Sequence, residues 1–154
     1  YEGYDKERQI KLFDKQVEYA VKKSLPVIVH CREATQDCLD VLNKYAPSGV
    51  VHCFSGSAET AEIVLGLGMY IGFTGALAFK NAKKAKRALE VVPMDRLLLE
   101  TDCPYMAPEP NRGRRNSSLN LPYVAEALAQ IKGITAEEVI AVTEENAKRL
   151  LFRA

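Results

Sequence analysis

The chain has 154 residues, of which 47% are hydrophobic and 27% charged, and this composition is typical of one globular domain. The formal net charge of +1 gives no overall field that would attract nucleic acid, so any affinity for phosphate must be local. No stretch of the sequence is long and apolar enough to cross a bilayer, so we expect no membrane partner.

Helical and strand patterns alternate along the chain. Short, nearly all-apolar runs predict four strands, at Val27–Cys31, Val50–Phe54, Met69–Phe73 and Leu97–Asp102. Six helices are expected around them, over residues 5–24, from Thr35, from Ser57, over residues 81–92, from Asn120 and from Thr135. A loop rich in Pro, Arg, Asn and Ser, from Pro104 to Asn120, separates the last strand from the last two helices.

Four of these helices have recognisable start signals. Thr35, Ser57 and Asn120 are the side chains that we expect to cap three of them, and Pro122 fits the first turn after Asn120. Thr135 and Glu138 form the pattern of a capping box.

Apolar strands separated by helices predict an α/β fold with a parallel sheet covered on both faces. Right-handed crossovers would place the carboxyl ends of all the strands on one edge of that sheet. An eight-unit (β/α) barrel needs about 250 residues, so four strands fit half a barrel, an open α/β sheet or a fragment of a longer protein. We expect a single domain over residues 1–154, because no repeat or linker divides the chain.

Three of the predicted strands end on side chains that can bind a metal or transfer a proton. His30 and His52 each follow a run of β-branched residues, and Asp102 stands in the corresponding place after Leu97–Leu99. Imidazole and carboxylate groups are common ligands of divalent metals, and such a site would leave positions open for water and substrate. Glu100, two residues before Asp102, would face the same side and orient a ligand or a water. The alternative for a single strand-end histidine is a hydrogen bond to the backbone.

The loop after Asp102 carries the only concentrated positive charge near this edge. Arg112 and Arg115 could bind phosphate oxygens through their guanidinium groups, and Gly113 would allow close approach of the backbone. A solvated basic loop is the alternative. The basic run Lys83–Arg87 fits a solvated helix face better than a binding site.

The four cysteines contain no CxxC pair, which disfavours a zinc knuckle or a thioredoxin-type motif. Three of them directly follow a strand-end His or Asp, at Cys31, Cys53 and Cys103. Because side chains alternate across a strand, we expect these thiols to point away from the site and to be buried and reduced under the helices. Reduced structural thiols suit a cytoplasmic protein.

The sequence motifs resemble those of the TatD family of metal-dependent hydrolases, the TatD-type deoxyribonucleases. The resemblance rests on residues 26–32 (PVIVHCR), 51–56 (VHCFSG), 98–105 (LLETDCPY) and 112–116 (RGRRN), and on Thr143, Asn146 and Ala147 near the end. It covers essentially the whole chain. It implies a TIM-like barrel with a two-metal centre, binding Mg²⁺, Mn²⁺ or Zn²⁺, that hydrolyses phosphodiester bonds, generally in DNA. The matching positions are His30, His52 and Asp102 as metal ligands, with Asp102 also placed to handle a proton.

The sequence departs from that family in one respect. Family members begin with a strand that carries a His-x-His pair, and later carry a Glu in a Gly-Glu-x-Gly-Leu-Asp segment, and neither motif occurs here. We therefore expect the chain to be the C-terminal portion of such a barrel, without roughly the first three βα units. On its own it would bind one ion weakly and have little or no activity. Two copies could associate to complete a barrel-like sheet.

Two other functions remain open. A metal-dependent amidohydrolase on the same barrel would be favoured by a Lys at a strand end, and the sequence has none there. A non-catalytic module would keep the fold and bind no metal.

Overall fold

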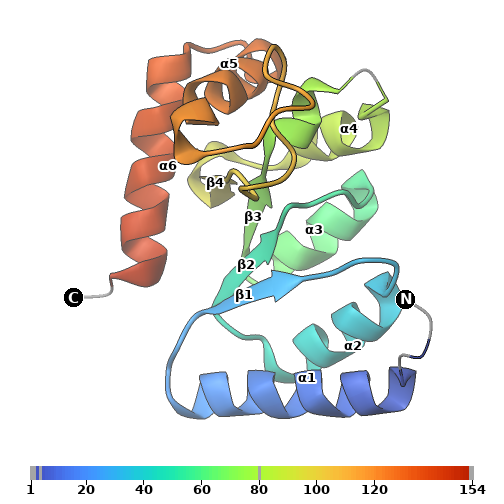
Figure 1. Cartoon of the computed structure of the whole chain (residues 1–154). Coiled ribbons are helices and arrows are strands. Elements are labelled where there is room, and N and C mark those ends of the chain that lie inside the picture. The colour runs from blue at the N-terminus through green and yellow to red at the C-terminus, as the bar shows by residue number, and fades with distance from the viewer. Residues whose placement is uncertain (1–2, 4, 80, 153–154) are drawn as a thin grey trace.

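The computed structural model describes residues 3, 5–79 and 81–152. Its four strands form one parallel sheet in the order β1-β2-β3-β4, which confirms the predicted α/β fold (Figure 1). The strands are β1 (Val27–His30), β2 (Gly49–His52), β3 (Tyr70–Phe73) and β4 (Leu97–Leu99). The α-helices are α1 (Lys6–Lys22), α2 (Thr35–Tyr45), α3 (Ala58–Gly66), α4 (Lys83–Val91), α5 (Leu121–Lys132) and α6 (Ala136–Leu151). Short 3₁₀ helices span Gly75–Ala78, Met94–Arg96 and Ser118–Asn120.

One face of the sheet forms the main core. Val29, Val51, Ile71 and Leu97 alternate with the residues of the other face and are almost fully buried. They pack in one cluster with apolar residues of the helices, which include Leu42, Val64, Leu89 and Leu128. Helices α2, α3 and α4 therefore cover this face, and α5 contributes Leu128 to the same cluster (Figure 1).

The other face is covered only in part. Leu150 of α6 packs there against Val50, Tyr70 and Leu98, and α6 lies across the sheet from α2, α3 and α4 (Figure 1). Ile28 on the edge strand β1 stays 68% exposed on this face. The expectation that both faces of the sheet are covered is therefore met on the first face and only in part on the second.

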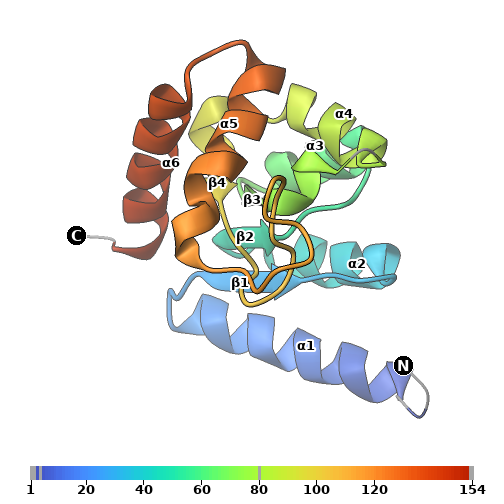
Figure 2. The same cartoon turned by 45° about the horizontal axis from the view of Figure 1, so that its top comes forward.

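Helix α1 lies at the β1 end of the molecule, beside α2 (Figure 2). Asp5 caps it, because its side chain accepts a hydrogen bond from the Arg8 amide. None of the described helices is long and apolar enough to span a bilayer.

Of the four predicted helix caps, two form as expected, one residue holds the cap position without a side-chain hydrogen bond to the helix, and one prediction is wrong. Ser57 caps α3, and Thr135 and Glu138 form the complete capping box of α6. Thr35 is instead the first residue of α2, with Ala34 at the cap position. Asn120 precedes α5, but its side chain hydrogen-bonds to Asn111 and Asn116 in the preceding loop instead of capping the helix.

Three strands end earlier than the sequence predicts, and the first of them, β1, stops at His30, one residue before the expected end. β2 stops at His52, directly before Cys53 with its left-handed φ of 47°, and β4 stops at Leu99, before the turn in which Asp102 has a φ of 55°. The backbone therefore departs from regular strand geometry at the residues that follow β2 and β4.

Candidate metal centre

The two histidines lie side by side at the carboxyl ends of adjacent strands. His30 and His52 are paired in the register of β1 and β2, and their ring centroids are 5.8 Å apart. His30 is exposed, whereas the side chain of His52 is only 19% exposed. The predicted convergence of these two strand ends is therefore present in the structure.

Glu100 reaches His52 from two strands away. Its Oε2 accepts hydrogen bonds from His52 Nδ1 at 2.7 Å and from the Cys53 amide at 2.9 Å. The carboxylate must pass over β3, and Gly72 on that strand leaves the space, because a Cβ there would overlap the carboxylate. The sequence alone suggested no role for Gly72. A glycine is needed there only because the Glu100 carboxylate passes over β3 at this position, and the sequence does not show that contact.

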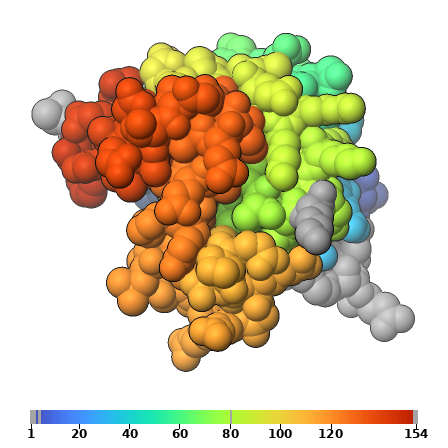
Figure 3. Space-filling view, turned by 90° about the horizontal axis from the view of Figure 1, so that it is seen from above, coloured from blue at the N-terminus to red at the C-terminus, as the bar shows by residue number. Residues whose placement is uncertain are grey.

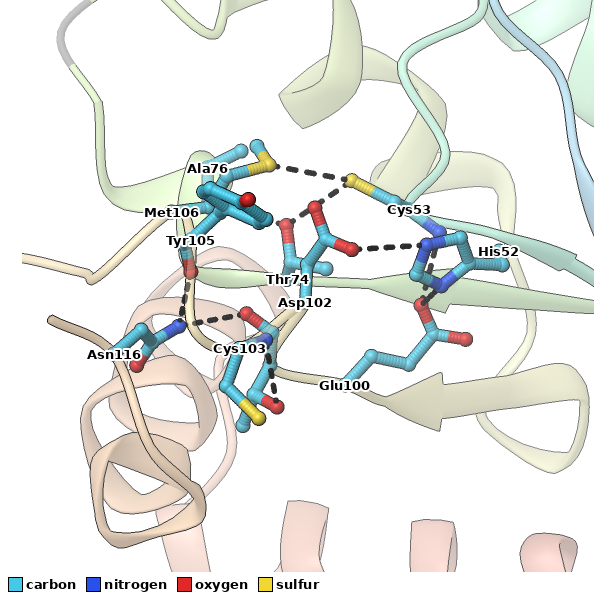
Figure 4. A network of polar contacts seen from close by, with 11 residues as sticks. His52, Cys53, Thr74, Ala76, Glu100, Asp102, Cys103, Tyr105, Met106 and Asn116 are labelled. Carbon is cyan, nitrogen blue, oxygen red and sulfur yellow. Dashed lines mark hydrogen bonds and ion pairs between the residues drawn. The ribbon is translucent and has the colours of Figure 1, made fainter.

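Asp102 contacts the other nitrogen of the same ring. Its Oδ1 lies 3.3 Å from His52 Nε2, and its left-handed backbone turns the carboxylate toward β2 (Figure 4). A non-glycine residue in this region of backbone space carries strain and is often found at functional sites. The prediction that Glu100 and Asp102 face the same site is confirmed, although a turn places Asp102 there instead of strand alternation.

The two carboxylates raise the pKa of His52 above its ordinary value. The hydrogen bond to Glu100 is the largest cause that raises the pKa of His52, and the charges of Glu100 and Asp102 raise it further. Burial acts in the opposite direction. A histidine that donates Nδ1–H to a carboxylate presents Nε2 with its lone pair to a metal, which is the usual arrangement of metal-binding histidines.

Cys53 does not point away from the site as the alternation of a strand predicts. Its Sγ lies 3.5 Å from Thr74 Oγ1 and 3.8 Å from Met106 Sδ, on the same side as Asp102 (Figure 4). The positive φ of Cys53 breaks the alternation and explains the error. Cys103 is also wrongly predicted, because it is exposed, and Cys31 is only half-buried.

Three donors are close enough to share one ion. The ligand atoms of His52, Cys53 and Asp102 all lie within 4.8 Å of one another. Imidazole, thiolate and carboxylate are all ordinary ligands of zinc and related metals, so the donor set fits a divalent cation. His30 lies beside this group, at the ring distance given above, but does not belong to it.

The arginine-bearing loop is tied to the end of β4. Asn116 is 3% exposed, and its amide donates hydrogen bonds to the carbonyls of Thr101 and Tyr105, both at 2.7 Å. Asn116 belongs to the motif at residues 112–116, but the sequence alone predicted no role for it. The loop projects beside α5 (Figure 3, gold to orange).

The predicted phosphate ligands lie on this loop. The Arg112 guanidinium stacks on Phe79 at 4.4 Å, with Glu109 at 3.9 Å. Gly113 has a φ of 84°, and Arg115 is exposed. No contact between these residues and His52 or Asp102 is found among the described residues.

Comparisons with known proteins define the family. The family model for TatD-related DNases matches residues 1–152. An uncharacterized metal-dependent hydrolase of Bacillus subtilis, YabD, is 45% identical over 148 residues, which are 94% of this chain and 58% of the relative. A protein of Erwinia tasmaniensis named as a 3′-5′ ssDNA/RNA exonuclease, TatD, is 36% identical over 154 residues, with 95% of this chain and 60% of the relative covered.

A solved structure agrees with the sequence comparisons. The TatD homologue YJJV of Escherichia coli K12 superposes with a TM-score of 0.88 at 31% identity, over 96% of this chain and 58% of that one. The α/β chain described here therefore belongs to the TatD-related DNase family. It spans about three fifths of the length of the relatives that it matches.

Proposed function

We propose that this chain carries part of the active centre of a metal-dependent phosphodiester hydrolase that acts on nucleic acid. The observation that supports it most is His52, whose two ring nitrogens are held between Glu100 at 2.7 Å and Asp102 at 3.3 Å, with His30 alongside. A histidine that served only the fold would not need two carboxylates and a second imidazole at a sheet edge.

The proposal divides the residues of the centre into metal ligands and a supporting carboxylate. His30, His52 and Asp102 would hold the metal, and Glu100 orients His52 through Nδ1. When bound, the metal supplies Lewis-acid polarisation of the phosphate. Asp102 is 32% exposed, so its carboxylate can also accept the proton of an attacking water.

The loop would supply the contacts to substrate. Arg112, Gly113 and Arg115 are exposed on it, and guanidinium groups recognise phosphate oxygens by paired hydrogen bonds. Tyr105 is 72% exposed at the start of the loop and offers a ring on which an unpaired base can stack. The name of the Erwinia tasmaniensis relative, an exonuclease of single-stranded DNA and RNA, supports single-stranded nucleic acid as the substrate class.

The amidohydrolase alternative gains no support from the site. None of the four strands ends on a lysine, and the residues that directly follow them are Cys31, Cys53, Thr74 and Glu100. Phosphodiester hydrolysis therefore stays the preferred chemistry.

The proposal can be tested with two proteins. One is the 154-residue chain, and the other is the same chain extended by the His-x-His strand and the Glu segment that the TatD resemblance implies. Both are incubated with a labelled single-stranded oligonucleotide and Mg²⁺ or Mn²⁺. We expect the extended protein to cleave it in a metal-dependent way and the chain alone to be weakly active or inactive.

Variants of the extended protein assign the residues. His52→Ala and Asp102→Asn should abolish cleavage, whereas Lys83→Ala on the exposed face of α4 should leave it unchanged. Equal and robust turnover by both proteins, or full activity of the His52→Ala variant, would show that the proposed centre is wrong.

We also propose that isolated copies of the chain associate with each other. β1 is an edge strand in the described sheet, and Ile28 on it exposes 68% of its surface. An open edge with an apolar side chain favours pairing with a second copy.

A further inference from the structure

Cys53 is the one cysteine whose thiol lies among the proposed metal ligands of the described chain. Its φ of 47° directs Sγ into the site, where it lies within 4.8 Å of the ligand atoms of both His52 and Asp102. Cys103, which follows the third strand-end residue, is exposed and belongs to no such group.

Two neighbours hold this thiol in place. Thr74 is 2% exposed and its Oγ1 lies 3.5 Å from Sγ, while the Met106 thioether lies 3.8 Å from Sγ. Burial is the largest cause that raises the pKa of Cys53, and the charges of Asp102 and Glu100 act in the same direction, whereas the hydrogen bond to the Thr74 hydroxyl lowers it. Thr74 and Met106 are thus positioning residues for Cys53.

The donor set determines which metals it suits. Mg²⁺ prefers oxygen ligands in octahedral geometry, and His52, Cys53 and Asp102 offer one nitrogen, one sulfur and a carboxylate. Thiolate and imidazole ligands favour Zn²⁺ and other thiophilic ions.

We propose that Cys53 is a metal ligand together with His52 and Asp102, and that the centre therefore binds Zn²⁺, Co²⁺ or Cd²⁺ in preference to Mg²⁺. This inference rests on the metal centre of the proposed function and adds a ligand and a class of metal to it. Binding converts the Cys53 thiol into a thiolate bonded to the ion, and the proton passes to solvent.

Cobalt provides a direct readout, because a Co²⁺–thiolate bond produces a charge-transfer band in the near ultraviolet. The 154-residue chain is reduced, freed of metal and titrated with CoCl₂. We expect the band in the wild type and in the Cys31→Ser and Cys103→Ser variants. It should vanish in Cys53→Ser, with Co²⁺ affinity lowered by on the order of tenfold or more.

A second measurement does not depend on the variant folding. The wild-type chain is alkylated with and without Cd²⁺, and each cysteine is quantified by peptide mass spectrometry. Cd²⁺ should protect Cys53 and leave exposed Cys103 as reactive as before, and an excess of Mg²⁺ should not displace that protection.

The outcomes separate this inference from the proposed function. If Co²⁺ binds in a way that needs His52 but gives no thiolate band, and Cys53 stays reactive, the metal centre stands and the role of Cys53 is refuted. A band that survives in Cys53→Ser would also refute it. If neither ion binds at all, the inference and the metal centre both fail.

Discussion

One carboxylate oxygen of Glu100 accepts two hydrogen bonds, one from the His52 ring and one from the Cys53 amide. It thereby links the end of β4 to the end of β2. At 16% exposure it is partly shielded from water, so the interaction is stronger than a surface ion pair.

Replacing Glu100 by Gln should weaken metal binding without removing a proposed ligand. Gln keeps the shape but loses the charge, and its single carbonyl oxygen accepts less strongly from the ring nitrogen. We expect roughly 10- to 100-fold weaker metal affinity by calorimetric titration. Glu62→Gln on the exposed side of α3 removes the same charge elsewhere and should have no effect.

Gly72→Ala tests the space over β3. The added Cβ would overlap the Glu100 carboxylate and force it away from His52. Metal affinity should fall on the order of tenfold or more, as for loss of the supporting carboxylate. Gly66→Ala is the matched control, because no atom lies within 4 Å of its Cβ position, and binding should be unchanged. An unaltered affinity in Gly72→Ala would mean that Glu100 is not needed at its observed position.

At the level of the elements, the capping box of α6 gives a pH-dependent prediction. The Thr135 amide and hydroxyl bond the Glu138 carboxylate and lower its pKa, the backbone bond being the larger cause. The folded-state pKa lies below the ordinary 4.5, so the stabilisation is present above pH 4.5 and is lost as the pH falls through the folded value.

Glu138→Gln should therefore lower the melting temperature at neutral pH, and the difference from wild type should shrink in acid below pH 4.5. Glu137→Gln changes a charge in the same turn outside the box, and its effect should be smaller at neutral pH. Thermal melts followed by circular dichroism at several pH values measure both. A difference that grew on acidification would have the wrong sign.

Helix starts show what local sequence can and cannot specify. The predicted capping box of Thr135 and Glu138 is confirmed, because all of its hydrogen bonds form within four consecutive residues. Asn120 carries an equally good capping side chain, but Asn116 and Asn111 compete for it. That competition depends on how the loop folds back, which no local pattern contains.

At the scale of the whole molecule, the convergence of His30 and His52 was predictable. Parallel strands joined by right-handed crossovers bring their carboxyl ends to one edge, and the register pairs these two residues directly. The direction of the Cys53 thiol was not predictable, because it depends on a left-handed residue just after the strand. The position of Asp102 next to His52 also depends on such a turn.

The open sheet edge gives a prediction about assembly. We expect the chain to self-associate at micromolar concentration in sedimentation velocity experiments, because β1 has an unpaired edge in the described sheet. The Ile28→Lys substitution should shift the association equilibrium toward the monomer. Leu12→Lys replaces another exposed apolar residue, 56% exposed on α1, and should not. A stable wild-type monomer would refute self-association.

The most direct test is metal binding by the chain itself. After equilibrium dialysis against Zn²⁺ or Mn²⁺, metal analysis should find up to about one ion per chain. Binding should be lost in His52→Ala and in Asp102→Ala, and weakened in His30→Ala, with all three variants still folded by circular dichroism. Wild-type protein that retains no metal, or variants that retain as much as wild type, would show that these strand ends do not form a metal centre.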